Sequence, residues 1–88
     1  MVKGTTKSGF EFEIDETRLD DYEFIEMLSD IEEDMTIFPK VARKILGVKQ
    51  HNALKEHLRD ENGIVPATAF EAEITEILSY GNENTLKN

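Results

Sequence analysis

The residues that decide the fold are 36–58, TIFPKVARKILGVKQHNALKEHL. Apolar side chains recur there at helical spacing, and Pro39 stands in the first turn, where its missing N–H costs no intrahelical hydrogen bond. Gly47 interrupts the pattern and is typical of the position just after a helix end. The stretch therefore predicts two short helices that meet at Gly47. Their apolar faces comprise Phe38, Val41, Ala42, Ile45 and Leu46 in the first and Val48, His51, Leu54 and Leu58 in the second.

Another short helix is predicted on the N-terminal side, starting at Asp20 and Asp21. Asp20 precedes Glu23 by three residues, which is the spacing of a capping box, and acids in a first turn favour the positive end of the helix dipole. The acidic run at 30–34 suits the negative end poorly, so we expect fraying there and a loop through about Met35. The apolar residues of this helix are Leu19, Tyr22, Ile25, Leu28 and Ile31, with Phe24 and Met27 beside them.

The N-terminal residues, about 3–15, predict a β-hairpin. Ser8 and Gly9 form a turn dipeptide, and residues 10–14 alternate apolar and acidic with period two. The alternation places three apolar side chains on one face, which has to pack against the helices because an isolated hairpin is only marginally stable.

The C-terminal side holds the last predicted helix. Pro66 favours an extended connector before it, and Thr68 with Glu71 has the spacing of a capping box. We expect Gly81 to end this helix. Its apolar face is Phe70, Ile74, Ile77 and Leu78.

Together these elements predict a mainly α fold: an N-terminal hairpin followed by four short helices in one compact domain, residues 1–80, and a polar, disordered tail, residues 81–88. The chain has no cysteine, which excludes disulfides and thiolate chemistry. No apolar run approaches the roughly 20 residues that cross a bilayer, and the N-terminus lacks the apolar core of a signal peptide. We therefore expect a cytoplasmic protein that is neither secreted nor embedded in a membrane.

Charge is unevenly distributed along the chain. The net charge is −9, and residues 1–38 alone sum to −9, whereas residues 39–59 carry six bases against one acid. A net charge of this size and sign repels nucleic acid and anionic membranes at long range. The simpler interpretation is that the two regions complement each other within one fold or between protomers. The alternative is a bipolar docking surface.

No pattern of catalytic or metal-binding residues stands out. His51 and His57 are six residues apart and point to different sides of a helix, so we expect His51 at the edge of the core and His57 in solvent. Residues 60–63 resemble part of a calcium loop, but a helix-ending turn explains them better. Glu73 and Glu76 are expected on a solvated face. The sequence thus predicts a non-enzymatic protein with no catalytic residue, cofactor or metal.

Residues 41–55 support an alternative, because they are similar to a helix-turn-helix whose second helix is rich in Lys, Gln, His and Asn. In that case Lys44 and Lys49 would contact phosphates. However, Ala42 and Gly47 are five residues apart, one more than the usual spacing, and DNA-binding domains are usually basic. Two packed helices with solvated polar faces are the favoured interpretation, and binding to nucleic acid is not expected.

Five stretches carry a resemblance to a known family: TKSGFEFEID at 6–15, LDDYE at 19–23, LGVKQ at 46–50, LKEHLRDENG at 54–63 and EITEI at 73–77. In this order they resemble the small acidic tail assembly chaperones of long-tailed phages and prophages of Gram-positive bacteria. The resemblance implies a mainly helical, non-enzymatic, self-associating protein that coats the long hydrophobic tape-measure protein before the tail tube polymerises around it. Many members of that family are also made in a longer form by translational frameshifting near the end of the gene.

Apolar residues of the first two helices are the expected contact surface for a protein partner, because the chain has more of them than a small core needs. The candidates are Phe24, Met27, Met35, Ile37 and Phe38. The resemblance implies the tape-measure protein as the partner, with self-association as a further contact. A structural component of the phage head or tail is another alternative.

Overall fold

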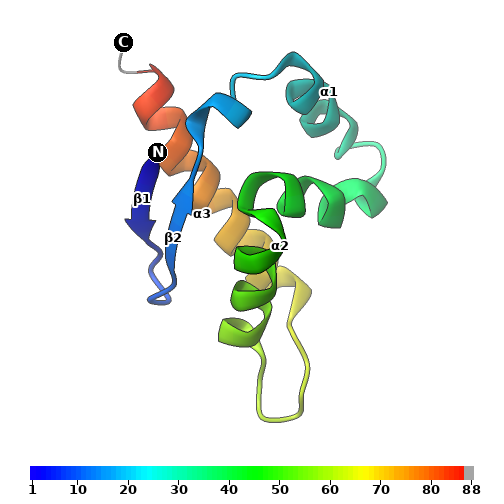
Figure 1. Cartoon of the computed structure of the whole chain (residues 1–88). Coiled ribbons are helices and arrows are strands. Elements are labelled where there is room, and N and C mark those ends of the chain that lie inside the picture. Colours follow the sequence, from blue (N-terminus) through cyan, green and yellow to red (C-terminus); the bar gives the residue numbers. More distant parts are fainter. Residues whose placement is uncertain (87–88) are drawn as a thin grey trace.

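The structure is a computed structural model that describes the backbone of residues 1–86 and the side chains of residues 1–80. Figure 1 shows an N-terminal hairpin followed by helices, with α3 passing behind the hairpin and α1 at the far end of the molecule. The predicted mainly α class with an N-terminal hairpin is confirmed. The elements are β1 (Val2–Thr5), β2 (Glu11–Ile14), the 3-10 helix η1 (Glu16–Arg18), α1 (Tyr22–Asp30), the 3-10 helix η2 (Met35–Ile37), α2 (Phe38–Leu58) and α3 (Ala67–Leu86).

The hairpin is held mainly by its buried face. β1 and β2 pair antiparallel with Val2 opposite Ile14. The period-two alternation of β2 buries Phe12 and Ile14 and leaves Glu11 and Glu13 exposed, as predicted. Each such apolar side chain contributes roughly 1.5–3 kcal/mol relative to an exposed one, which stabilises a two-stranded sheet that is marginal alone.

The core lies where the hairpin, α2 and α3 meet. α1 adds Phe24, the one buried residue of that helix. The buried apolar side chains are Val2, Phe10, Phe12, Ile14, Leu19, Phe24, Val41, Ala42, Ile45, Leu46, Leu54, Ile74 and Ile77.

α2 bends at Gly47, and for this reason residues 1–86 contain three α-helices where the sequence predicts four. The backbone of Gly47, with φ 76° and ψ 161°, is not helical, but helical residues flank it directly, so the two predicted helices form one element. Its two halves, 38–46 and 48–58, run in different directions (Figure 1). Residues with a Cβ rarely adopt this conformation, so glycine is required at the bend.

Aspartates cap the N-termini of three helices. Asp15, Asp21 and Asp34 are the N-cap residues of η1, α1 and η2, and each carboxylate accepts a hydrogen bond from the backbone N–H two residues on. The predicted capping box of Asp20 and Glu23 is therefore wrong, because the N-cap of α1 is the next residue along.

Both ends of α3 differ from the prediction. The helix begins at Ala67, so Thr68 lies inside it and is not its N-cap. It continues through Gly81 to Leu86, since a glycine within a helix costs only about 1 kcal/mol relative to alanine and does not by itself end one. The chain is thus helical over most of the predicted tail, and residues 87–88 lie outside the described part.

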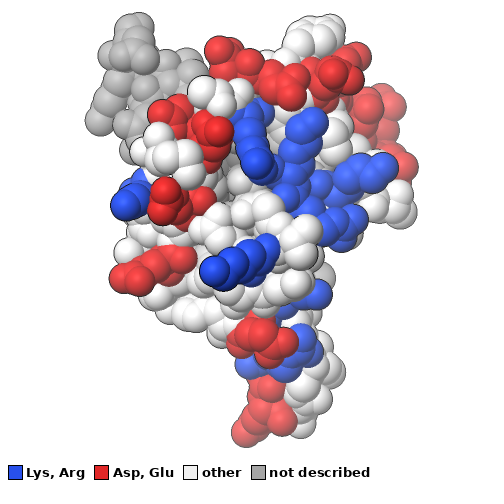
Figure 2. Space-filling model, in the orientation of Figure 1, with Lys and Arg blue, Asp and Glu red and all other residues white. Residues whose placement is uncertain are grey.

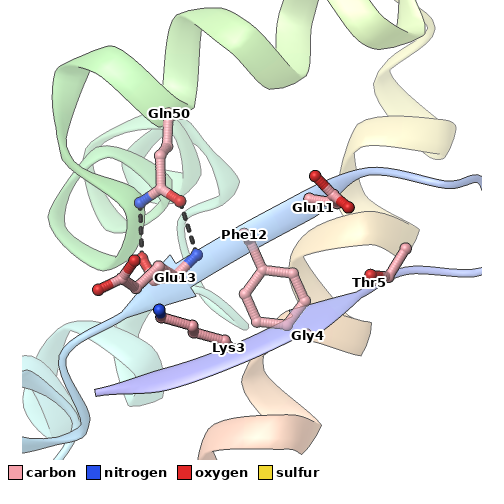
Figure 3. A pocket seen from close by; sticks show the side chains of 7 residues that line it. All are labelled: Lys3, Gly4, Thr5, Glu11, Phe12, Glu13 and Gln50. Atoms are coloured by element: carbon pink, nitrogen blue, oxygen red, sulfur yellow. Dashed lines mark hydrogen bonds between the residues drawn. The ribbon is translucent and has the colours of Figure 1, made fainter.

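Side chains from the helices also fix the edges of the hairpin. Gln50 of α2 lies beside β2, where its amide oxygen accepts from the Glu13 N–H and its amide nitrogen donates to the Glu13 carbonyl, both at 2.7 Å. Figure 3 shows this amide bonded to the strand as a neighbouring backbone would be. On β1, the Tyr80 hydroxyl donates to the Thr5 carbonyl at 2.9 Å.

Candidate functional site

The strongest candidate for a binding site is an open hollow of about 440 Å³ bordered by η2, α2, the loop after α2 and the start of α3. The bend at Gly47 shapes it, because both halves of α2 contribute to its walls. We term it the α2–α3 groove. Its volume falls within the roughly 300–1,000 Å³ of ligand pockets. Its lining consists of Met35, Phe38, Pro39, Arg43, His51, Lys55, Val65, Ala67, Phe70 and Glu71.

Phe70 of α3 contacts side chains from both halves of α2 in the groove. Its ring meets that of Phe38 edge-on, with 6.4 Å between centroids, and that of His51 with 5.4 Å between centroids. His51 is only 7% exposed, so it is more deeply buried than the sequence predicts. Burial, together with the positive charges of Lys55 and Arg43, lowers the pKa of His51 and favours its neutral ring.

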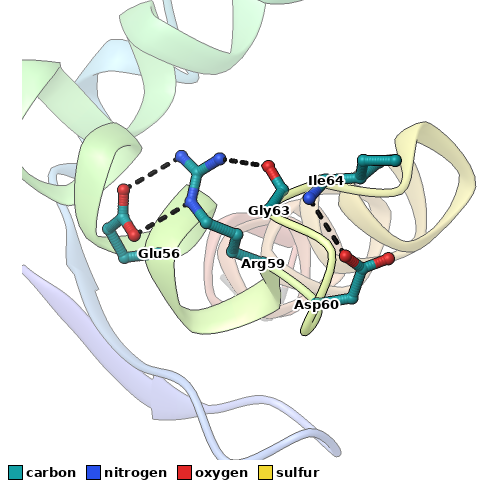
Figure 4. A network of polar contacts seen from close by, with 5 residues as sticks. All are labelled: Glu56, Arg59, Asp60, Gly63 and Ile64. Carbon is teal, nitrogen blue, oxygen red and sulfur yellow. Dashed lines mark hydrogen bonds and ion pairs between the residues drawn. The ribbon is translucent and has the colours of Figure 1, made fainter.

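A network around Arg59 holds the loop between α2 and α3, whose Val65 lines the groove (Figure 4). The guanidinium donates two hydrogen bonds to the Glu56 carboxylate, at 3.0 and 2.9 Å, and one to the Gly63 carbonyl, at 2.8 Å. The Asp60 carboxylate accepts from the Ile64 N–H at 3.0 Å. Hydrogen bonds and charge from Arg59 lower the pKa of Glu56. These contacts confirm the predicted helix-ending turn.

The rim of the groove is basic although the chain as a whole is acidic. Arg43 and Lys55 line the groove with a single acid, Glu71, among the described residues. Figure 2 shows bases gathered over α2, below a group of acids at the α1 end. Lys44 and Asp21 join the two regions, with 3.7 Å between ammonium and carboxylate. Some of the opposite charges therefore pair within the fold, as Lys44 and Asp21 do, whereas the bases Arg43 and Lys55 lie at the groove.

The fold separates the five residues predicted to contact a partner. Met35 is 51% exposed and Phe38 is half-buried, and both line the groove. Met27 and Ile37 are half-buried and lie outside its lining. Phe24 is 1% exposed and belongs to the core, so it is not accessible to a partner. The sequence missed the wall formed by α3, because only tertiary packing brings that helix to the groove.

A second polar cluster joins the hairpin turn to α2 and α3. The Ser8 hydroxyl donates to the Glu73 carboxylate and lies 3.0 Å from Nε2 of His57, and the Lys7 N–H donates to Glu76 at 3.0 Å. Glu73 is 6% exposed and Glu76 is half-buried, so the predicted solvated face is wrong for both. The reason is that the hairpin turn packs over this part of α3.

The geometry of this cluster favours a structural role. Because the one hydroxyl hydrogen of Ser8 goes to Glu73, Nε2 of His57 has to donate to the serine oxygen and does not accept its proton. In a nucleophilic triad the carboxylate would instead orient the histidine. Helical spacing could have placed Glu73 on the apolar face of its helix. Phe70 lies three residues before it and Ile77 four residues after it, and residues at these spacings share one face.

Another hollow, of about 560 Å³, lies over the exposed face of the hairpin (Figure 3). Lys3, Thr5, Glu11 and Glu13 line it, and Gln50 there is already bonded to β2. Because these side chains are polar and mostly exposed, the hollow provides less apolar contact than the α2–α3 groove. We therefore take the groove as the candidate functional site.

The described residues contain no group of three or more His, Asp or Glu side chains placed to hold a metal ion. Over the same part of the chain, the helices are too short or too polar to span a membrane. Comparisons with protein-family models, with curated proteins and with solved structures find no match for this chain.

Proposed function

We propose that this chain is a non-enzymatic protein-binding module whose α2–α3 groove receives a helix of a protein partner. The observation that carries the proposal is one hollow combining an apolar lining, with Met35, Phe38 and Phe70, and basic side chains, Arg43 and Lys55. Helix-in-groove recognition uses apolar residues at i, i+3, i+4 and i+7 of the bound helix. The partner that fits is an amphipathic helix whose apolar residues are flanked by acids.

The biological partner we propose is the tape-measure protein of a phage tail, which makes this chain a tail assembly chaperone. The resemblance of its sequence to that family supports the assignment. A long apolar helix that awaits assembly aggregates unless it is covered, and a coat with a net charge of −9 stays soluble. A contact limited to one groove is small, so each copy can leave when the tail tube polymerises.

A helix-turn-helix regulator is the second candidate, and the bend at Gly47 favours it because two helical segments meet there at an angle (Figure 1). Against it, Lys44 is paired with Asp21, and the net charge is −9. If α2, which contains Lys49, binds DNA, the affinity should fall steeply as the salt concentration rises. Titration of the chain with duplex DNA at low salt tests this candidate, and salt-dependent association would favour it over the groove.

The test of the chaperone proposal is co-expression with the chain encoded just downstream, taken to be the tape-measure protein. We expect the wild-type chain to keep that protein soluble in a complex with many copies of the chaperone. The double variant Arg43→Glu/Lys55→Glu reverses the charge of the groove and should weaken the complex at least about tenfold, equivalent to roughly 1.4 kcal/mol. Affinity capture and light scattering measure both effects.

Lys49→Glu is the matched control, because Lys49 is an exposed base of α2 outside the groove lining. It should bind as the wild type does. Equal binding by the control and the groove variant, or precipitation of the long protein with wild type present, would contradict the proposal.

A further inference from the structure

The exposed face of α1 combines apolar and acidic side chains. Tyr22 is 73% exposed and Ile25 is 50% exposed, while Phe24 on the opposite side is in the core. Glu26 and Asp30 are also exposed. Since Glu26 lies four residues from Tyr22 and from Asp30, the three follow one side of the helix, with Ile25 adjacent. This side of α1 is therefore an amphipathic, acidic surface.

The surroundings of α1 are strongly acidic. Residues 19–38 contain eight acids and no lysine or arginine. A surface that covers this face and satisfies its chemistry has to bring both positive charge and an apolar pocket. The α2–α3 groove brings both, with Arg43 and Lys55 beside Phe38 and Phe70.

We propose that α1 of one copy of this chain docks into the α2–α3 groove of a second copy, with Tyr22 and Ile25 in the groove and Glu26 and Asp30 toward its basic rim. The contact joins two different surfaces and is therefore head-to-tail. The buried side of α1 is fixed by Phe24 in the core of its own copy, so the exposed side faces outward.

Net charge opposes this association at long range, since each copy carries −9. At 0.15 M ionic strength, however, screening limits that repulsion to about 8 Å, so the charges at the contact itself dominate. The contact is small, and small interfaces are weak and transient. Association should therefore depend strongly on concentration.

This inference rests on the proposed function, because the same groove would hold either α1 of another copy or the helix of a partner. Where copies associate, α1 of one copy covers the groove of another, and a partner helix displaces it. Self-association and partner binding are thus competing states of one site, and a partner peptide should dissociate the oligomers.

The experiment is sedimentation of the full chain at 0.15 M salt, from about 10 µM to about 1 mM, a range suited to a weak interface. Wild type should pass from monomer to larger species. Ile25→Asp, on α1, and Arg43→Glu/Lys55→Glu, in the groove, should each remain monomeric while keeping the circular dichroism of the wild type. Mixed one to one, the two variants should form a dimer and nothing larger, because one intact α1 then meets one intact groove.

Three results would overturn the inference: a monomeric wild type throughout the range, self-association of Ile25→Asp equal to wild type, or no dimer in the mixture. None of these contradicts the proposed function, which is measured separately. Ile25→Asp keeps its groove and should still bind the partner, so a loss of self-association without a loss of partner binding identifies the contact as α1 in the groove.

Discussion

The imidazole ring of His51 packs against Phe70, and two bases, Lys55 and Arg43, lie near it. A protonated ring there would be poorly hydrated and repelled by both bases. These effects, burial first, lower the pKa of His51 in the folded protein below its ordinary value of 6.5, although a hydrogen bond with Asn52 opposes them. In the unfolded chain the pKa returns to about 6.5.

We predict that His51 makes the fold less stable as the pH falls below about 6.5. The unfolded chain takes up the proton first, so the free energy of unfolding falls with pH from that value down to the folded-state pKa. His51→Gln should flatten this part of the profile, measured from urea midpoints between about pH 7.5 and 5. An unchanged slope in His51→Gln would contradict the assignment.

The residue scale is also where sequence patterns are least informative. Gly47 and most apolar positions of α2 follow from spacing alone, but the prediction is wrong for Val48, which is 67% exposed. By contrast, the contact of Ser8 with Glu73 joins residues 65 positions apart, and nothing local specifies it. The N-cap of α1 was missed by one residue, because Asp20 and Asp21 carry the same side chain and only backbone conformation distinguishes them.

At the scale of elements, the bend in α2 is the decisive feature. The periodicity of apolar residues predicts both halves and the break between them. It does not predict their relative direction, which depends on the backbone angles of Gly47, and that direction shapes the groove. The groove could therefore be predicted only in part: Met35 and Phe38 were candidates from the sequence, but Phe70 was not.

We predict that Gly47→Ala destabilises the protein by about 1–3 kcal/mol. No atom lies within 4 Å of an added Cβ, so the cost comes from the backbone conformation, with φ at 76°, and not from a clash. Urea denaturation measures it. Val48→Ala, at a neighbouring position that is 67% exposed, is the control and should change stability by less than about 0.5 kcal/mol. Equal stability of Gly47→Ala and wild type would mean that α2 straightens without cost.

At the scale of the whole molecule, charge is the dominant feature. The net charge is −9, and the ion pairs among the described side chains are few and exposed. Such pairs contribute about 0–1 kcal/mol each, so they do not offset the repulsion among the acids near α1. The compact state therefore brings like charges together with little compensation.

We predict that raising NaCl from about 0.01 M to about 0.3 M raises the midpoint of thermal unfolding by a few degrees, because salt screens this repulsion. The double variant Glu32→Lys/Glu33→Lys replaces two exposed acids and should be more stable than wild type at low salt, with a smaller response to added salt. Scanning calorimetry measures both. A midpoint that falls with salt in wild type would show that attraction between the acidic and basic regions dominates.

The amide of Gln50 has a consequence for crowding. A short hairpin with a bare strand edge invites other strands to add to it and seed fibrils. Here one side chain occupies the backbone groups of Glu13 as another strand would, and the Tyr80 hydroxyl occupies the Thr5 carbonyl on the other strand. Even when many molecules of this chain are crowded together, we therefore expect little polymerisation into sheets through the hairpin.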